Sequence, residues 1–73
     1  MKQFILLGSN LYLVYGVHRL DSDKPFKPLK YEGRCEVLYR DRSGLGGIDS
    51  IVLDNPDIMS YEEAIKEYPE YFI

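Results

Sequence analysis

The sequence contains very few of the side chains that carry out catalysis. Among its 73 residues there are one cysteine, one histidine and no tryptophan. A single thiol, Cys35, can form neither an intramolecular disulfide nor a CxxC metal site. A catalytic Cys-His pair would require Cys35 to meet His18 in space, but Cys35 lies on the apolar side of a predicted strand, where a small buried side chain is usual. We therefore expect no enzymatic activity, no cofactor and no bound metal.

The scarcity of cysteine also bears on compartment and stability. Small secreted domains usually carry several paired cysteines, so one free cysteine favours the cytoplasm. A domain of this size buries only about 60% of the surface of its unfolded chain. Without disulfides or a metal, self-association is the remaining source of extra stability. Seven tyrosines, a residue type enriched at interface cores, favour it as well. We predict a single compact domain over residues 1–73 that forms a homo-oligomer.

Long hydrophobic runs are absent too. The N-terminal stretch MKQFILLGSNLYLVYGV has the charge and apolar character of a signal peptide, but Gly8, Ser9 and Asn10 interrupt it. No small-x-small cleavage site follows before His18. The run is also shorter than the roughly 20 residues that a membrane-spanning helix needs. We therefore expect a cytoplasmic protein without a membrane partner.

The residues that are present favour β-strands over most of the chain. Residues 4–7 and 11–17 are rich in β-branched and aromatic side chains, and the Gly-Ser-Asn turn between them predicts a hairpin. Residues 34–40 alternate between apolar and polar side chains, and an apolar run follows at residues 48–53, which predicts a second hairpin. A proline-containing loop at residues 21–30 connects the two hairpins.

The clearest local signal predicts one helix near the C-terminus. In the run Ser60-Tyr61-Glu62-Glu63, the Ser60 hydroxyl can accept from the Glu63 N–H while the Glu63 carboxylate reaches back to Ser60, which forms a capping box. One apolar stripe at helical spacing consists of Tyr61, Ala64, Ile65 and Tyr68. Pro69 disfavours helical geometry at Tyr68 and ends the helix near there. The expected fold class is α+β: a small antiparallel sheet of about four strands, in two hairpins, with one C-terminal helix packed on one face.

Charge is divided unevenly along the chain, whose net charge is −3. Residues 18–42 carry seven basic side chains against five acidic ones, whereas residues 43–73 carry one against seven. The acidic segment would oppose a nucleic-acid backbone, so we expect no general nucleic-acid binding. The same segment offers a different surface, because its acidic helix is followed by an apolar tail that either docks on its own sheet or inserts into a neighbour.

The stretch RDRSGLGG at residues 40–47 is the most suggestive binding motif. Guanidinium groups bind phosphate oxygens with paired hydrogen bonds, and glycines allow backbone N–H groups to approach an anion. The match is weak, because the stretch lacks the pattern GxxxxGK[ST] and no helix begins after it, so a hairpin turn is the simpler explanation. Tyrosines of the same sheet are candidates for stacking a base. The candidate ligand-binding residues are Arg40, Arg42, Ser43, Gly44, Gly46, Gly47, Tyr12 and Tyr39.

Two functions are therefore predicted. The first is a non-catalytic homo-oligomer that sequesters a nucleotide or another phosphorylated anion at residues 40–47. The second is a protein-protein interaction module or inhibitor, for example one of the phage type that acts against host defence. Its candidate interaction residues are Glu62, Tyr71, Phe72 and Ile73. The comparison with phage inhibitors rests on size and composition alone.

Overall fold

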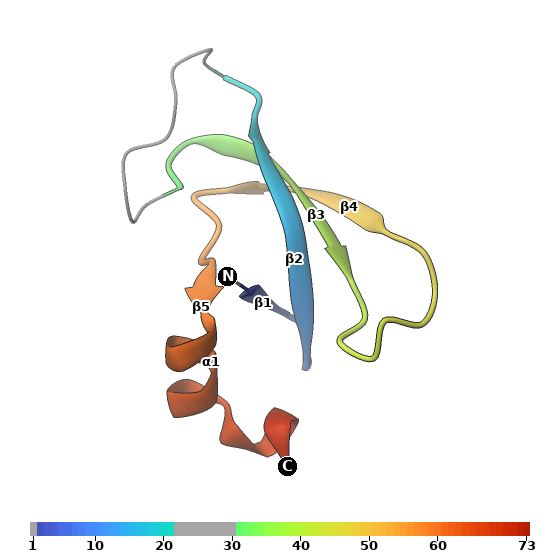
Figure 1. Ribbon diagram of the computed structural model, residues 1–73. Coiled ribbons are helices and arrows are strands. Elements are labelled where there is room, and N and C mark those ends of the chain that lie inside the picture. The colour runs from blue at the N-terminus through green and yellow to red at the C-terminus, as the bar shows by residue number, and fades with distance from the viewer. Residues whose placement is uncertain (1, 22–30) are drawn as a thin grey trace.

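The computed structural model has the α+β fold that the sequence predicts (Figure 1). It describes residues 2–21 and 31–73. Five antiparallel strands form one sheet in the order β4-β3-β2-β1-β5, and a short C-terminal helix packs against it. The elements are β1 (Gln3–Leu7), β2 (Asn10–Arg19), β3 (Arg34–Arg40), β4 (Asp49–Asp54), β5 (Met59–Ser60), α1 (Tyr61–Glu67) and the 3₁₀ turn η1 (Pro69–Phe72).

Both predicted hairpins are confirmed. β1 pairs with β2 across a tight turn in which Gly8 has a φ of 63°, a conformation that favours glycine. β3 pairs with β4 on one side and with β2 on the other, so the first four strands form a continuous meander. Residues 22–30 of the predicted loop between the hairpins lie outside the described residues.

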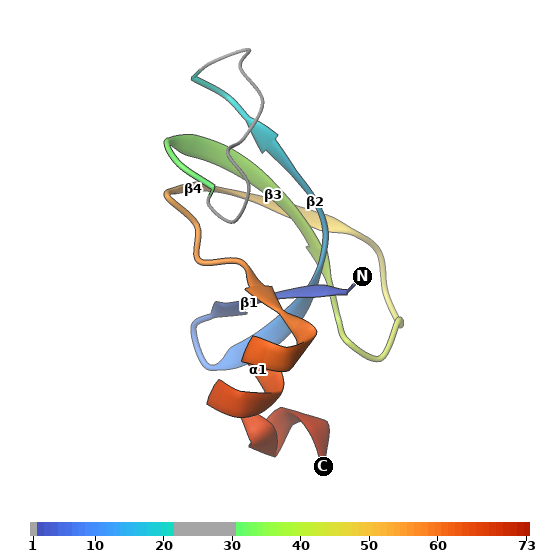
Figure 2. The ribbon, with the colours of Figure 1, turned by 60° about the vertical axis from the view of Figure 1, so that its left-hand side comes forward.

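The sequence did not predict the fifth strand, β5. Met59 pairs with Phe4 and Ser60 pairs with Gln3, which adds two residues to the free edge of β1. A strand of two residues is too short to produce a visible alternation, and this one continues directly into the helix. Its effect is large nonetheless, because it places α1 and the C-terminus at the β1 end of the sheet, away from β4 (Figure 2).

Two apolar clusters stabilise the sheet, one on each face. Alternation along β1 places Phe4 in the first cluster, with Leu11 and Ala64 of α1, and places Ile5 in the second. Val37 is fully buried in the second cluster. On β2 the register shifts between Val14 and Gly16, and this β-bulge leaves the side chain of Tyr15 66% exposed.

The helix begins and ends where the sequence predicts. The Ser60 hydroxyl accepts from the Glu63 N–H at 3.1 Å, and the Glu63 carboxylate accepts from the Ser60 N–H at 3.2 Å. The helix ends at Glu67, two residues before Pro69. Of its seven residues only Ala64 is fully buried, so the helix is held by one narrow side. No helix in the described ranges is long and apolar enough to cross a membrane.

Candidate functional site

In the turn between β3 and β4, several polar groups form hydrogen bonds with one another. The Asp41 carbonyl accepts from the Gly44 N–H at 3.0 Å, and the Ser43 hydroxyl accepts from the Leu45 N–H at 3.2 Å. The same hydroxyl donates to the Asp41 carboxylate at 2.9 Å. These hydrogen bonds from Ser43 lower the pKa of the Asp41 carboxyl below its usual value of 3.8. The N–H groups of residues 44 and 45 therefore stabilise the turn itself.

Arg40 closes this turn from the inside. Its Nη2 atom donates to the carbonyl oxygens of Gly44 and Gly46, at 3.2 Å for the latter. The two glycines have φ angles of 80° and 82°, which favour glycine, whereas Gly47 has ordinary backbone geometry. Among the described residues no hydrogen-bond partner lies next to the buried Nε atom of Arg40. Of the predicted ligand-binding residues, Arg40, Gly44 and Gly46 thus maintain the shape of the turn.

Arg42 reaches in another direction and fastens the C-terminal tail to the sheet. Its Nε atom donates to the Leu11 carbonyl at 2.7 Å, and its Nη1 atom donates to the Tyr71 carbonyl. The guanidinium carbon lies 4.9 Å from the centre of the Tyr71 ring, within cation-π distance. The Tyr71 hydroxyl in turn donates to the Ser9 carbonyl at 2.6 Å. Arg40 and Arg42 therefore bind separate sets of carbonyl groups.

Tyr12 and Tyr39 lie on the other face of the sheet. Their rings pack edge to face, with centroids 4.9 Å apart, and Tyr12 packs against the second apolar cluster. Leu13, which follows Tyr12 on β2, faces the opposite side and packs against the first apolar cluster, as does Tyr71, the ring that Arg42 contacts. The structure therefore separates these two predicted stacking residues from Arg42.

A groove of about 530 Å³ joins residues of both predicted sites. Arg42 and Ser43, from the turn, line it together with Tyr71 and Phe72, from the tail. Lys2 adds a second cation to the lining, for which the sequence had offered no signal.

The floor of the groove is a cluster of aromatic rings. Phe72 packs edge to face against Phe4 and against Tyr61, with centroid distances of 5.4 and 5.7 Å. Phe4 is buried, but Tyr61 remains 45% exposed. Tyr61 was predicted as part of the apolar side of the helix, and its contact with the tail is what makes it part of a site. Ile73, in contrast, is fully exposed.

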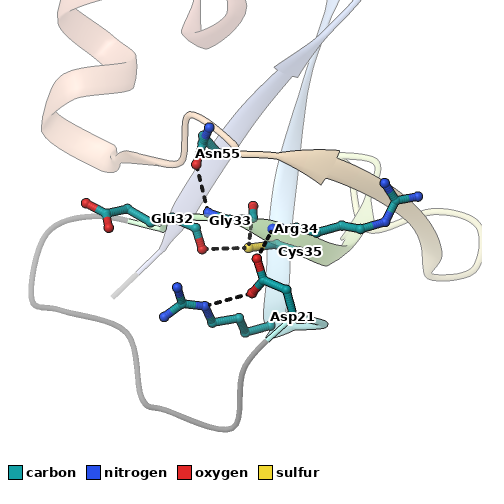
Figure 3. Close-up of polar contacts among 7 residues, drawn as sticks. Asp21, Glu32, Gly33, Arg34, Cys35 and Asn55 are labelled. Carbon is teal, nitrogen blue, oxygen red and sulfur yellow. Dashed lines mark hydrogen bonds and ion pairs between the residues drawn. The ribbon is translucent and has the colours of Figure 1, made fainter.

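A second polar cluster ties the ends of β2, β3 and β4 together (Figure 3). The Asp21 carboxylate accepts from the Arg34 backbone N–H and from Arg19 Nε, each at 3.1 Å. The Arg34 N–H, followed by the Arg19 side chain, lowers the pKa of Asp21 below 3.8. Asn55 and Gly33 exchange two hydrogen bonds, from the Gly33 N–H to Asn55 Oδ1 at 2.7 Å and from the Asn55 N–H to the Gly33 carbonyl at 2.8 Å.

The cysteine and the histidine do not come together. Cys35 is fully buried, its thiol donates to the Gly33 carbonyl at 3.5 Å, and burial raises the pKa of that thiol. His18 pairs with Glu36, the neighbour of Cys35 on β3, so the two side chains lie on opposite faces of the sheet. Within residues 2–21 and 31–73, no three potential metal-binding side chains of the His, Cys, Asp or Glu types gather.

Asp21 should make the stability of the fold depend on acid. Because folding lowers its pKa, the unfolded chain binds this proton more tightly, so the stabilisation is present above the usual pKa of 3.8 and is lost as the pH falls through the folded value. We expect Asp21→Asn to lower the urea midpoint at pH 7 and to flatten its decline below about pH 4. Asp49→Asn, at an exposed position of β4, serves as the control. An unchanged acid decline in Asp21→Asn would contradict this role.

No family model matches the chain, and neither a curated protein nor a solved structure does.

Proposed function

We propose that this protein is a non-catalytic binding protein for a small phosphorylated ligand with an aromatic base, such as a nucleotide. The proposal rests on one observation: two cations, Lys2 and Arg42, and a half-exposed ring, Tyr61, line the same groove. A phosphate and a base are the two parts of a nucleotide that such a lining recognises. The proposed site is therefore the groove between the β3–β4 turn and the tail, whereas the sequence had indicated the turn at residues 40–47 alone.

The phosphate end of the ligand lies at the basic side of the groove. Arg42 uses its Nε and Nη1 atoms to bind carbonyl groups, so Nη2 is the guanidinium nitrogen left for an oxygen of the ligand. Lys2 supplies a flexible ammonium group as a second cation of the same groove. The Asp41 carboxylate also lines the groove and is negatively charged at neutral pH, because even the usual carboxyl pKa of 3.8 lies well below 7. Its repulsion of a phosphate is offset by the positive charges of Lys2 and Arg42, which line the same groove.

The base stacks on the aromatic floor. Stacking of a base on an aromatic side chain contributes about 1–3 kcal/mol and requires one accessible ring face. Tyr61 is 45% exposed, and its edge-to-face contact with Phe72 holds the ring in place, so we assign the stacking to this ring. In this proposal Arg40, Gly44 and Gly46 shape the turn that carries Arg42 and Ser43.

The groove proposal is tested with a panel of adenosine monophosphate, adenosine and inorganic phosphate. We expect the nucleotide to raise the melting temperature and to bind more tightly by calorimetry than either of its parts. Lys2→Ala and Tyr61→Ala should each weaken nucleotide binding about tenfold, which is the effect of losing about 1.4 kcal/mol. Lys66→Ala removes an equal charge from the exposed side of α1 and should bind as the wild type does. No binding at millimolar nucleotide would exclude the proposal.

The second candidate, a protein-protein interaction module or inhibitor, is favoured by a separate observation. Ile73 projects fully exposed from the docked tail, and Glu62 is exposed on the first turn of the helix. An apolar end beside an acidic helix suits a basic partner surface. The two candidates differ in one respect: removal of Ile73 would weaken a protein contact but would leave nucleotide binding in the groove unchanged.

A further inference from the structure

The outer edge of β4 carries backbone groups that none of the described strands binds. β4 is the terminal strand of the sheet and, among the described strands, pairs only with β3. Just beyond it, the Asn55 N–H bonds to the Gly33 carbonyl at 2.8 Å. Pairs in an antiparallel ladder alternate between bonded and non-bonded, so counting back from this pair shows that the odd-numbered residues of β4 bond to β3. The N–H and C=O groups of its even-numbered residues point away from the sheet.

The pairing of β3 with β2 leads to the same assignment. The Leu20 N–H bonds to the Arg34 carbonyl at 2.8 Å, which makes Leu20 and Arg34 a bonded pair. By the same alternation, the even-numbered residues of β3 bond to β2 and its odd-numbered residues are left for β4. In the register between the two strands, odd residues of β3 face odd residues of β4.

The three residues of β4 whose backbone groups point away from the sheet are Ser50, Val52 and Asp54, and the side chains of all three are exposed. Val52, at the centre, is 42% exposed. Open strand edges are templates for a further strand, and proteins commonly block them with lysine or proline. β4 contains neither residue, and its two charged side chains, Asp49 and Asp54, stand at its ends. The middle of this edge is therefore open for pairing.

We propose that β4 pairs antiparallel with β4 of a second copy of this chain, across a two-fold axis at Val52. Aligning the two strands end to end would place Asp49 opposite Asp54 of the second copy, where like charges repel. Only residues whose backbone groups point outward can hydrogen-bond across the contact, and on β4 these are the even-numbered ones. The alignment of Asp49 with Asp54 sets odd-numbered residues against even-numbered ones, so the hydrogen-bonding pattern excludes it. The contact that remains is self-complementary, as a two-fold interface requires.

With Val52 on the axis, each residue of the central strand meets a suitable partner. Ser50 faces Asp54 of the second copy, so that a hydroxyl donor meets a carboxylate. Ile51 faces Leu53 of the second copy, and Val52 faces its own equivalent. Ile51 and Leu53 of the two copies thus meet on the face of the second apolar cluster, and the two Val52 side chains meet on the opposite face. Cross-strand pairs of this kind stabilise a sheet.

The residues at the ends of the contact favour an axis at Val52 over an axis at Ile51. Asp49 faces Asn55 of the second copy, whereas an axis at Ile51 would place Asp49 opposite the apolar Leu53. On β3, Arg34 pairs with Asp54 and shares its side of the sheet, so its positive charge offsets that carboxylate. A contact of one short strand per copy belongs to the small-interface class, and the dimer therefore dissociates on dilution.

The oligomeric state tests the contact directly. Analytical ultracentrifugation of the full chain should show twice the monomer mass at high concentration and the monomer on dilution. Val52→Lys places two ammonium groups opposite each other on the axis and should raise the dimer dissociation constant at least tenfold. Tyr15→Lys adds the same charge at the exposed bulge of β2 and should dimerise as the wild type does. A wild-type monomer at every concentration, or an unchanged Val52→Lys dimer, would overturn the proposal.

Cysteine cross-linking tests the axis itself. Bonded pairs of an antiparallel ladder have Cα atoms about 5.5 Å apart, which a disulfide can span. Under mild oxidation Val52→Cys should form a covalent dimer, whereas Ser50→Cys, which faces Asp54, should stay unlinked. The wild type is the blank, since its own Cys35 is fully buried. Linking at residue 50 instead of 52 would overturn the axis. This contact lies apart from the ligand groove, so nucleotide binding and dimer formation succeed or fail independently.

Discussion

Gly33→Ala should lower the free energy of unfolding by more than the roughly 1–2 kcal/mol that a left-handed backbone alone costs, a large share of the stability of a domain this small. Two effects combine. The φ of Gly33 is 84°, in the left-handed region, which costs a residue with a Cβ atom about 1–2 kcal/mol. The new Cβ would also lie 2.3 Å from Asp21 Oδ2, so the carboxylate would have to move and release its hydrogen bonds to Arg34 and Arg19.

Other glycines of the chain separate these two effects. Gly44 has a φ of 80° but no heavy atom within 4 Å of an added Cβ, so Gly44→Ala should cost only the left-handed backbone, about 1–2 kcal/mol. Gly47 has neither constraint, and Gly47→Ala should change stability by less than about 0.5 kcal/mol. Urea unfolding at pH 7 measures all three. If Gly33→Ala cost no more than Gly44→Ala, Asp21 would not be the obstacle.

Phe72→Ala should destabilise the fold by about 2–3 kcal/mol, at the lower end for a lost aromatic ring because Phe72 is only half-buried. The ring packs edge to face on Phe4 and Tyr61, and the neighbouring Tyr71 is held by Arg42 and Ser9. The substitution would leave the buried Phe4 partly uncovered. Thermal unfolding should show the melting temperature falling by about 10 °C or more.

Ile73→Ala is the matched control for the tail. Ile73 is fully exposed and next to Phe72, so its truncation should leave stability within about 0.5 kcal/mol of the wild type. A neutral Phe72→Ala would contradict a docked tail. The pair also guides functional work: a deletion of residues 71–73 removes part of the core together with any binding surface, whereas a change at Ile73 affects the surface alone.

The structure changes the interpretation of the RDRSGLGG stretch. Two arginines so close in sequence predicted a shared anion site, but their guanidinium groups bind different backbone carbonyls. Arg40 binds those of its own turn, and Arg42 binds Leu11 and Tyr71, about thirty positions away on either side. A long, flexible side chain finds its acceptors in space, and no spacing along the chain encodes them.

The sequence by itself determined the features whose causes are local. The turn residues between β1 and β2 set the first hairpin, alternation marks β3, the capping box starts α1 at Ser60, and Pro69 ends it. Each signal lies within a few residues of the structure that it specifies. Together they were sufficient for the α+β class and for the sheet with one helix on it.

Only the tertiary structure decided what lies beside what. It added β5 to the edge of β1, because two residues gain their pairing from a strand more than fifty positions away. It separated Tyr12 and Tyr39 from Arg42, because neighbouring residues of a strand face opposite sides. It brought Lys2 and Tyr61 to the groove and left the outer edge of β4 without a partner among the described strands. The contacts responsible join chain segments that carry no common sequence pattern. Local interactions select the elements, and long-range packing and hydrogen bonding assemble the site.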